Sequence, residues 1–86
     1  MYELRFDKDA EEAYSKADDK LAGRLNRCFE QLRENPLNHP NIKALKGKLE
    51  GLYRYRSGDW RIIYEPDKKE YIVNILQIVR RNKAYR

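Results

Sequence analysis

The 86-residue sequence contains one cysteine, one histidine and no hydrophobic run approaching twenty residues. Because Cys28 is the lone cysteine, an internal disulfide or a cysteine-based metal cluster is excluded. Without a long apolar run, no transmembrane helix is expected. The first residues, Met-Tyr-Glu-Leu-Arg-Phe-Asp, lack the basic-then-apolar order of a secretory signal. We therefore expect a cytoplasmic protein that makes no membrane contact.

Several motifs of known chemical sites are also missing. The four glycines do not form a phosphate-binding loop, and the chain shows neither a nucleophile elbow nor the spacing of metal ligands. We therefore expect no cofactor and no metal. The sequence has no internal repeat and no low-complexity tract, and residues 1–86 are predicted to form a single domain with one core.

The net charge of +5 is distributed unevenly along the chain. Residues 1–42 hold seven basic and nine acidic side chains, whereas residues 43–86 hold twelve basic and five acidic ones. A basic half on a small domain favours a polyanionic partner, and nucleic acid is the commonest. A basic surface that only maintains solubility is the alternative at this point.

The N-terminal part has the pattern of a strand followed by two helices. Alternation over residues 1–6 predicts a short strand, and Asp7 stands at the N-cap position of a first helix. Asp18 and Asp19 are expected to end that helix and to cap the second, which should stop just before Pro36. The second helix has an apolar face, formed by Leu21, Leu25, Cys28, Phe29 and Leu32.

Residues 52–64 predict a β-hairpin, because two alternating runs flank the turn-forming pair Gly58-Asp59. A two-residue turn pairs Ser57 with Trp60, Arg56 with Arg61, and Arg54 with Ile63. One face of the hairpin then carries the three arginines. The other face carries Tyr53, Tyr55, Trp60, Ile62 and Tyr64.

After a connector over residues 36–51 and this hairpin, residues 71–79 form a nearly continuous apolar strand that should lie centrally in the sheet. The predicted fold class is α+β, in the order β-α-α-β-β-β. An antiparallel helical hairpin covers one face of a mostly antiparallel four-stranded sheet. The helix side should hold the hairpin aromatics together with Ile72, Leu76 and Ile78.

If the last strand lies beside the hairpin, four guanidinium groups converge on the open face, those of Arg54, Arg56, Arg61 and Arg81. Such groups bind phosphate and stabilise developing negative charge. Arginine is a poor proton-transfer group, because it stays protonated. Cleavage of RNA would therefore need other groups, and the candidates are Tyr85, Lys46, Lys48, Lys83 and His39.

Tyr85 is the best of these candidates, because the neighbouring Arg80, Arg81 and Arg86 would favour its phenolate. It could equally stack on an RNA base, or simply pack against the domain. His39 lies in a proline-flanked loop and is expected to be structural. Cys28 is expected to be a small core residue.

The sequence resembles the RelE/ParE superfamily, the toxins of type II toxin–antitoxin systems. The resemblance covers nearly the whole chain. It is carried by Leu45-Lys46-Gly47 leading into residues 52–64, and by the ending Ile78-Val79-Arg80-Arg81-Asn82-Lys83-Ala84-Tyr85. RelE-type members are ribosome-dependent endoribonucleases that cut mRNA in the decoding site. The resemblance implies cleavage without a metal, leaving a 2′,3′-cyclic phosphate and a 5′-hydroxyl.

By position, the resemblance makes Arg61 and Arg81 the transition-state and phosphate-binding arginines. Tyr85 matches a tyrosine proposed as base or base-stacking group, and Arg54 stands at the site of a catalytic lysine. The implied RNA-binding residues are Arg56, Arg80, Lys46, Lys48, Lys83 and Arg86. Leu52 and Arg80 stand where many relatives have lysine and histidine, which leaves the general acid and base open.

The resemblance also implies partners: a RelB-like antitoxin, the ribosome with its mRNA, and operator DNA only through the antitoxin complex. Two alternatives remain open on the sequence. A ParE-type member of the same fold would inhibit DNA gyrase, although such members lack the convergent arginines and the C-terminal tyrosine. A plain basic nucleic-acid-binding module would explain the charge but not the tyrosine ending.

Overall fold

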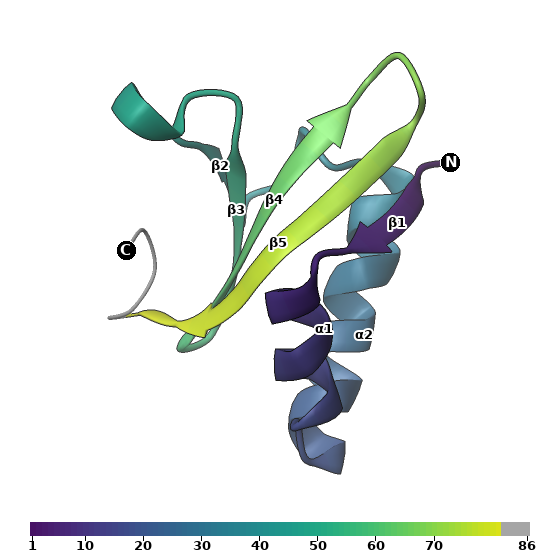
Figure 1. Ribbon diagram of the computed structural model, residues 1–86, viewed down its shortest axis with the longest axis vertical. Coiled ribbons are helices and arrows are strands. Elements are labelled where there is room, and N and C mark those ends of the chain that lie inside the picture. The colour runs from purple at the N-terminus through teal and green to yellow at the C-terminus, as the bar shows by residue number, and fades with distance from the viewer. Residues whose placement is uncertain (82–86) are drawn as a thin grey trace.

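The computed structural model describes residues 1–81, which form a five-stranded sheet with two helices packed on one face (Figure 1). The helices are α1 (Lys8–Ser15) and α2 (Asp19–Glu34), and a 3₁₀ turn, η1, spans Gly47–Leu49. The strands are β1 (Glu3–Phe6), β2 (Ile42–Ala44), β3 (Tyr53–Ser57), β4 (Trp60–Asp67) and β5 (Ile72–Arg80). Their order across the sheet is β1-β5-β4-β3-β2. Among these strands only β1 and β5 pair in parallel. Two helices on one face of a mostly antiparallel sheet confirm the predicted α+β class.

The predicted count of four strands is wrong within residues 1–81, because part of the connector pairs with the hairpin as β2. In this pairing Lys43 lies opposite Arg54, and β2 covers the outer edge of β3. A run of three residues is too short to show the alternation by which strands are recognised in sequence. The pairing shields an edge that would otherwise present unpaired backbone groups to other chains.

The two helices form the predicted antiparallel hairpin (Figure 1). The carboxylate of Asp18 accepts a hydrogen bond of 2.8 Å from the backbone N–H of Leu21, which caps α2 as expected. The helix ends at Glu34, two residues before Pro36. Between the helices, the hydroxyl of Tyr14 donates a hydrogen bond of 2.7 Å to Asn26 Oδ1.

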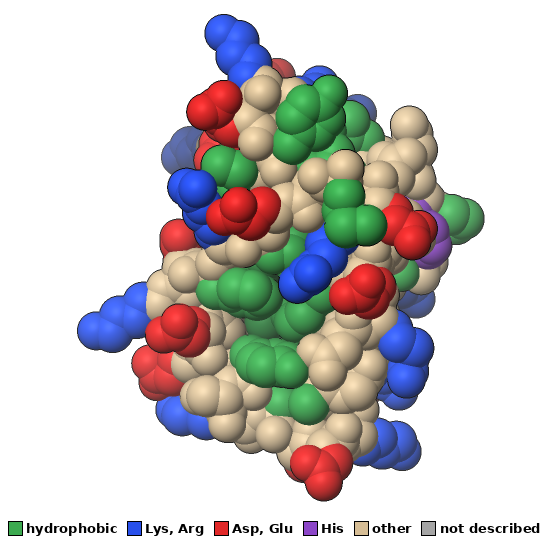
Figure 2. Space-filling view, turned by 90° about the vertical axis from the view of Figure 1, so that its right-hand side faces the viewer, with side chains coloured by type: hydrophobic (Ala, Val, Ile, Leu, Met, Phe, Trp, Pro, Cys, Tyr) green, Lys and Arg blue, Asp and Glu red, His purple; other side chains and the backbone are tan. Residues whose placement is uncertain are grey.

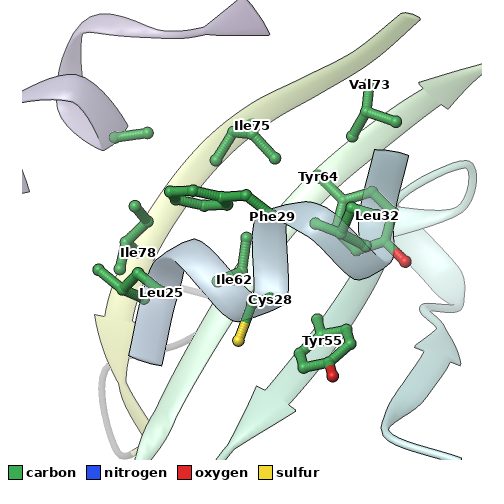
Figure 3. Close-up of a cluster of buried hydrophobic side chains, with 11 residues drawn as sticks. Leu25, Cys28, Phe29, Leu32, Tyr55, Ile62, Tyr64, Val73, Ile75 and Ile78 are labelled. Carbon is green, nitrogen blue, oxygen red and sulfur yellow. The ribbon is translucent and has the colours of Figure 1, made fainter. Parts of the chain in front are cut away.

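The core lies between α2 and one face of β3, β4 and β5 (Figure 3). Leu25 and Leu32 of α2 are fully buried, and Phe29 lies between them along the helix. The residues that pack with them are Ala10, Cys28, Tyr55, Ile62, Tyr64, Val73, Ile75 and Ile78. Burial of these apolar side chains stabilises the fold and fixes which sheet face remains open. The expectation that Cys28 is a core residue is confirmed.

The assignment of Ile72 and Leu76 to the helix side is wrong. The register between β4 and β5 shifts after Ile63, which pairs with Gln77, whereas Tyr64 pairs with Ile75. This bulge inserts one extra residue and reverses the facing of β5 N-terminal to it. Val73 and Ile75 are therefore the buried residues, and by alternation Ile72 and Leu76 face the other way. The prediction assumed that the residues of this strand alternate without interruption between the two faces, and nothing in the sequence indicated the bulge.

The predicted hairpin register is confirmed in full. Ser57 lies opposite Trp60, and Arg56 lies opposite Arg61. Gly58 has a φ of 58°, which is the backbone conformation required at the first central position of a Gly-X turn. The arginines of the hairpin therefore face away from the helices.

Candidate functional site

A concavity of about 480 Å³ opens on the sheet face opposite the helices. Its lining residues are Lys43, Ala44, Leu45, Lys46, Arg54, Arg61 and Arg81. Tyr55 and Ile62 point into the core, so the preceding residues Arg54 and Arg61 point to the opposite face. Among the described residues, the lining has five cationic side chains and no carboxylate.

Arg61 is the most firmly positioned of these cations. It lies on β4, between Arg56 of β3 and Val79 of β5, and only 9% of it is exposed. Its Nη1 donates hydrogen bonds of 3.0 Å to the backbone carbonyls of both Gly58 and Trp60. These bonds hold the guanidinium in one orientation, because they use donors on one end of the planar group.

Arg81 and Arg54 are anchored at either side of Arg61. The backbone N–H of Arg81 donates to the carbonyl of Asp59 over 2.7 Å, which ties the end of β5 to the hairpin turn. On β3, Arg54 Nη1 donates to the carbonyl of Asn41 over 3.2 Å. Three of the four arginines expected to converge therefore line one concavity, as the strand parity predicted.

Two lysines from the connector complete the lining. Lys46, already a candidate RNA-binding residue, lies in the concavity directly before η1. Lys43 was missed by the sequence reasoning, because the strand that places it opposite Arg54 was not predicted. The three residues of β2 are too few to signal this strand in the sequence. Lys48, within η1, is exposed and is not among the lining residues.

Arg56 and Arg80 lie apart from this lining. Arg56 shares the open sheet face and is exposed, but it does not border the concavity. Arg80 lies on the helix side, with its guanidinium carbon 5.1 Å from the ring centre of Trp60. Alternation along β5 explains this placement, since Arg80 and Arg81 must point to opposite faces. Lys83, Tyr85 and Arg86 lie outside the described residues.

The tyrosines near the hairpin belong to the core side and not to the concavity. Burial raises the pKa of both Tyr55 and Tyr64, so both remain protonated at neutral pH. The hydroxyl of Tyr64 donates a buried hydrogen bond of 2.6 Å to the carbonyl of Pro36. His39 stacks on Tyr55 at 5.3 Å and its Nδ1 accepts a bond from the backbone of Asn41. The interpretation of His39 as structural agrees with these contacts.

Within residues 1–81, no group of three or more histidine, cysteine, aspartate or glutamate side chains is arranged to hold a metal ion. In the same part of the chain, no helix has both the length and the apolarity needed to cross a membrane.

The side of the molecule with β1 and the helices has a mixed surface. Figure 2 shows acidic and basic side chains interspersed there around apolar groups. The concavity, by contrast, brings cations together from β2, β3, β4 and the end of β5. Several guanidinium groups around one hollow can hold a phosphodiester and offset the charge that develops on it during cleavage.

Comparison with known families identifies the chain. The model of the ParE toxin of type II toxin–antitoxin systems, parDE, matches residues 1–85. The chain belongs to this family. It is a type II toxin of the RelE/ParE superfamily, as the hairpin and the C-terminal ending suggested.

Individual relatives of this toxin agree with that assignment. Toxin RelE of Mycobacterium tuberculosis (strain ATCC 25618 / H37Rv) is 39% identical over 61 residues, which cover 69% of this chain and 63% of that protein. The match thus spans less than two thirds of that relative's length.

Solved structures of toxin–antitoxin complexes have the same fold. The toxin–antitoxin complex RelBE2 from Mycobacterium tuberculosis contains a chain that superposes with a TM-score of 0.79 at 28% identity, covering 93% of this chain and 98% of that one. A chain of the archaeal RelE–RelB complex from Pyrococcus horikoshii OT3 superposes with a TM-score of 0.80 at 26% identity. This match covers 96% of this chain and 98% of that one.

The toxin departs from the RelE pattern at Leu52, and the structure gives that departure a context. Leu52 borders a groove of about 340 Å³, whose other lining residues are Leu49, Ile63, Leu76, Gln77, Asp7 and Asp9. Leu52 is not among the residues that line the concavity, to which the connector contributes Lys43 and Lys46.

Proposed function

We propose that this toxin is a metal-independent endoribonuclease that cuts mRNA in the decoding site of the ribosome and thereby stops translation. The observation that carries the proposal is the convergence of Arg54, Arg61 and Arg81 with Lys43 and Lys46 on one concavity. A hollow surrounded by guanidinium groups suits a phosphodiester that becomes more negative as it reacts. The 39% identity to a protein named Toxin RelE supports the same assignment.

In the proposed reaction, the 2′-oxygen of the substrate attacks the adjacent phosphorus and loses its proton. The bond from phosphorus to the 5′-oxygen breaks, and the leaving oxygen takes up a proton. The products are a 2′,3′-cyclic phosphate and a 5′-hydroxyl. Arg61 and Arg81 stabilise the pentacovalent phosphorane, and Arg54 orients the phosphate.

The proton transfers need groups other than arginine. Lys46 and Lys43 border the concavity, which makes them candidates for these proton transfers. Tyr85 keeps its role as a proposed base or base-stacking group. The ribosome would be required for cleavage because it aligns the 2′-oxygen for in-line attack or supplies a proton carrier that the toxin lacks.

We further propose that an antitoxin restrains the toxin. The relatives in the RelBE2 and RelE–RelB structures are complexes with antitoxins. An acidic segment of a RelB-like partner would lie well against the cationic concavity and block access of RNA. Contact with operator DNA would come through that complex. Because ribosomes are the proposed target, the toxin would act in the cytoplasm.

The test is incubation of the purified toxin with programmed ribosomes carrying a defined mRNA, with the naked mRNA alongside. Mapping of 5′ ends by primer extension locates every cut. Cuts inside the decoding-site codon that require ribosomes would support the proposal. Equal cutting of naked RNA would replace it with a ribosome-independent nuclease, and no cutting in either reaction would reject nuclease activity.

A second candidate is inhibition of DNA gyrase, favoured by the ParE name of the family model that matches residues 1–85. A supercoiling assay with purified gyrase separates the two candidates. Loss of supercoiling at toxin concentrations that leave ribosome-bound mRNA intact would establish this candidate and exclude the nuclease.

A further inference from the structure

A second basic pocket lies on the helix side of the sheet, at the same corner of the molecule as the concavity. It has a volume of about 250 Å³, and its lining residues are Asp18, Lys20, Leu21, Arg24, Trp60 and Arg80. None of these residues borders the concavity. The sequence reasoning placed Arg80 with the RNA-binding residues but gave no function to Lys20, Arg24 or Trp60.

Strand alternation explains why two basic pockets lie back to back. Trp60 and Arg80 are directly opposite each other on β4 and β5 and face the helices. Their neighbours Arg61 and Arg81 point to the other side of the sheet. Each strand end therefore contributes one residue to each pocket, and only the sheet separates the two.

The guanidinium groups of the second pocket lie close to the residues of the hairpin turn. The guanidinium of Arg80 lies over the Trp60 ring at 5.1 Å, within the range of a cation–π interaction. Arg24, on α2, reaches under the hairpin turn. A Cβ atom at Gly58 would lie 2.8 Å from its Nη1, so the glycine leaves room for the guanidinium.

These cations outnumber the acidic groups of the pocket and form no ion pair within the part of the chain that the structure describes. Asp18 is the acidic residue in the lining, and its Oδ1 already accepts the backbone N–H of Leu21. None of the ion pairs over residues 1–81 involves Lys20, Arg24 or Arg80; the pairs are Arg5–Glu3, Lys16–Glu12 and Arg33–Glu30. Three cations and the one carboxylate of Asp18 leave the hollow with a net positive charge, which attracts an anion.

We propose that this second pocket binds the phosphate backbone of RNA, as a contact separate from the cleavage site. The choice of RNA as the anion rests on the proposed function. The phosphates would come either from the mRNA strand that extends from the concavity around the sheet corner, or from ribosomal RNA beside the toxin. In both cases the pocket adds affinity and orients the toxin without taking part in bond cleavage.

The test compares the variants Arg24→Ala and Arg80→Ala with Arg27→Ala, a matched control on the exposed side of α2. The first probe is a fluorescent single-stranded RNA carrying 2′-O-methyl groups, which cannot be cut by 2′-attack. Its dissociation constant is measured by anisotropy over a series of salt concentrations. The second probe is the vacant ribosome, with binding measured by co-sedimentation over the same salt series.

For single-stranded RNA, log affinity falls with log salt, and each phosphate contact that is lost should make this negative slope shallower by about 0.7. A shallower slope with the oligonucleotide for both pocket variants, and not for Arg27→Ala, would support the proposal and assign the phosphates to mRNA. An unchanged oligonucleotide slope with weaker, less salt-dependent ribosome binding would support it with ribosomal RNA as the source. Slopes equal to those of Arg27→Ala with both probes would overturn it.

These readouts do not depend on cleavage. A toxin that cuts no RNA, but whose pocket variants lose salt-dependent binding, would contradict the proposed function and leave the second pocket in place. Normal cleavage with unchanged slopes would support the proposed function and overturn the second pocket as an RNA contact. Because Arg24 and Arg80 come from different elements, a folding defect in one variant, detected by thermal unfolding, leaves the other to decide.

Discussion

Arg61 Nη1 donates a hydrogen bond of 3.0 Å to the carbonyl of Gly58, so the turn of the hairpin holds the most buried cation of the concavity. On its other side, the same glycine leaves room for Arg24 in the second pocket. The turn thus holds the guanidinium of Arg61 on one face of the sheet and lies close to that of Arg24 on the other. The conformation of Gly58 therefore bears on both proposed RNA contacts.

The first prediction concerns Arg61→Lys. Lysine keeps the charge but loses the planar fork that contacts carbonyl and phosphate together. We expect the single-turnover cleavage rate on programmed ribosomes to fall by about 10²–10³-fold, as when one donor to a developing oxyanion is removed. Thermal unfolding should show a folded protein. A rate within a factor of two of the wild type would show that charge at this position is sufficient.

The second prediction separates two lysines that the sequence could not distinguish. Lys46→Met should slow cleavage by at least about tenfold, and by about 10²-fold if this lysine transfers a proton. Lys48→Met is the matched control, since Lys48 lies only two residues away but outside the concavity. It should retain wild-type rates in the same ribosome assay. Equal losses in both variants would mean that the connector acts only through its total charge.

The third prediction tests the bulge in β4 and β5. Ile75 is fully buried, so Ile75→Ala should lower the free energy of unfolding by about 2–5 kcal/mol. Leu76 borders the open groove, and Leu76→Ala should cost clearly less. Urea unfolding of the two variants makes the comparison. A larger loss for Leu76→Ala would mean that strict alternation, and not the bulge, describes β5.

The fourth prediction concerns the buried hydroxyl of Tyr64. Tyr64→Phe leaves the carbonyl of Pro36 without this donor, and should cost about 1–3 kcal/mol of stability at pH 8 while sparing cleavage. Chemical denaturation and the ribosome assay check the two parts. Loss of all cleavage at a temperature where Tyr64→Phe is still folded would contradict the assignment of Tyr64 to the core.

The pH dependence of the same variant follows from the pKa of Tyr64, which burial raises above its ordinary value near 10. In the unfolded chain the phenol loses its proton first, so stability is fully present below about pH 10 and falls as the pH rises further. Phenylalanine removes this contribution. The stability lost between pH 9 and pH 11 should therefore be smaller in Tyr64→Phe. An equal loss in both proteins would contradict the raised pKa.

The sequence predicted those elements in which a pattern of residue types repeats over several residues. Alternation around Gly58-Asp59 was long enough to set the hairpin register, and that register placed Arg54 and Arg61 on one face. Three-residue β2 carried too few residues for a pattern, and so Lys43 was missed. The bulge was not predicted because no residue type on β4 or β5 marks it in the sequence, and it is seen only in the pairing register and in the burial of Val73 and Ile75.

The most direct test of the account is the rate at which Arg81→Ala cuts mRNA on programmed ribosomes, measured at saturating toxin. Arg33→Ala is the matched control, because Arg33 is an exposed arginine of α2 that pairs with Glu30 and does not line the concavity. We expect wild type and Arg33→Ala to cut inside the decoding-site codon at equal rates, and Arg81→Ala to be slower by about 10²–10³-fold. Equal rates for all three proteins would show that the cationic concavity is not the site of cleavage.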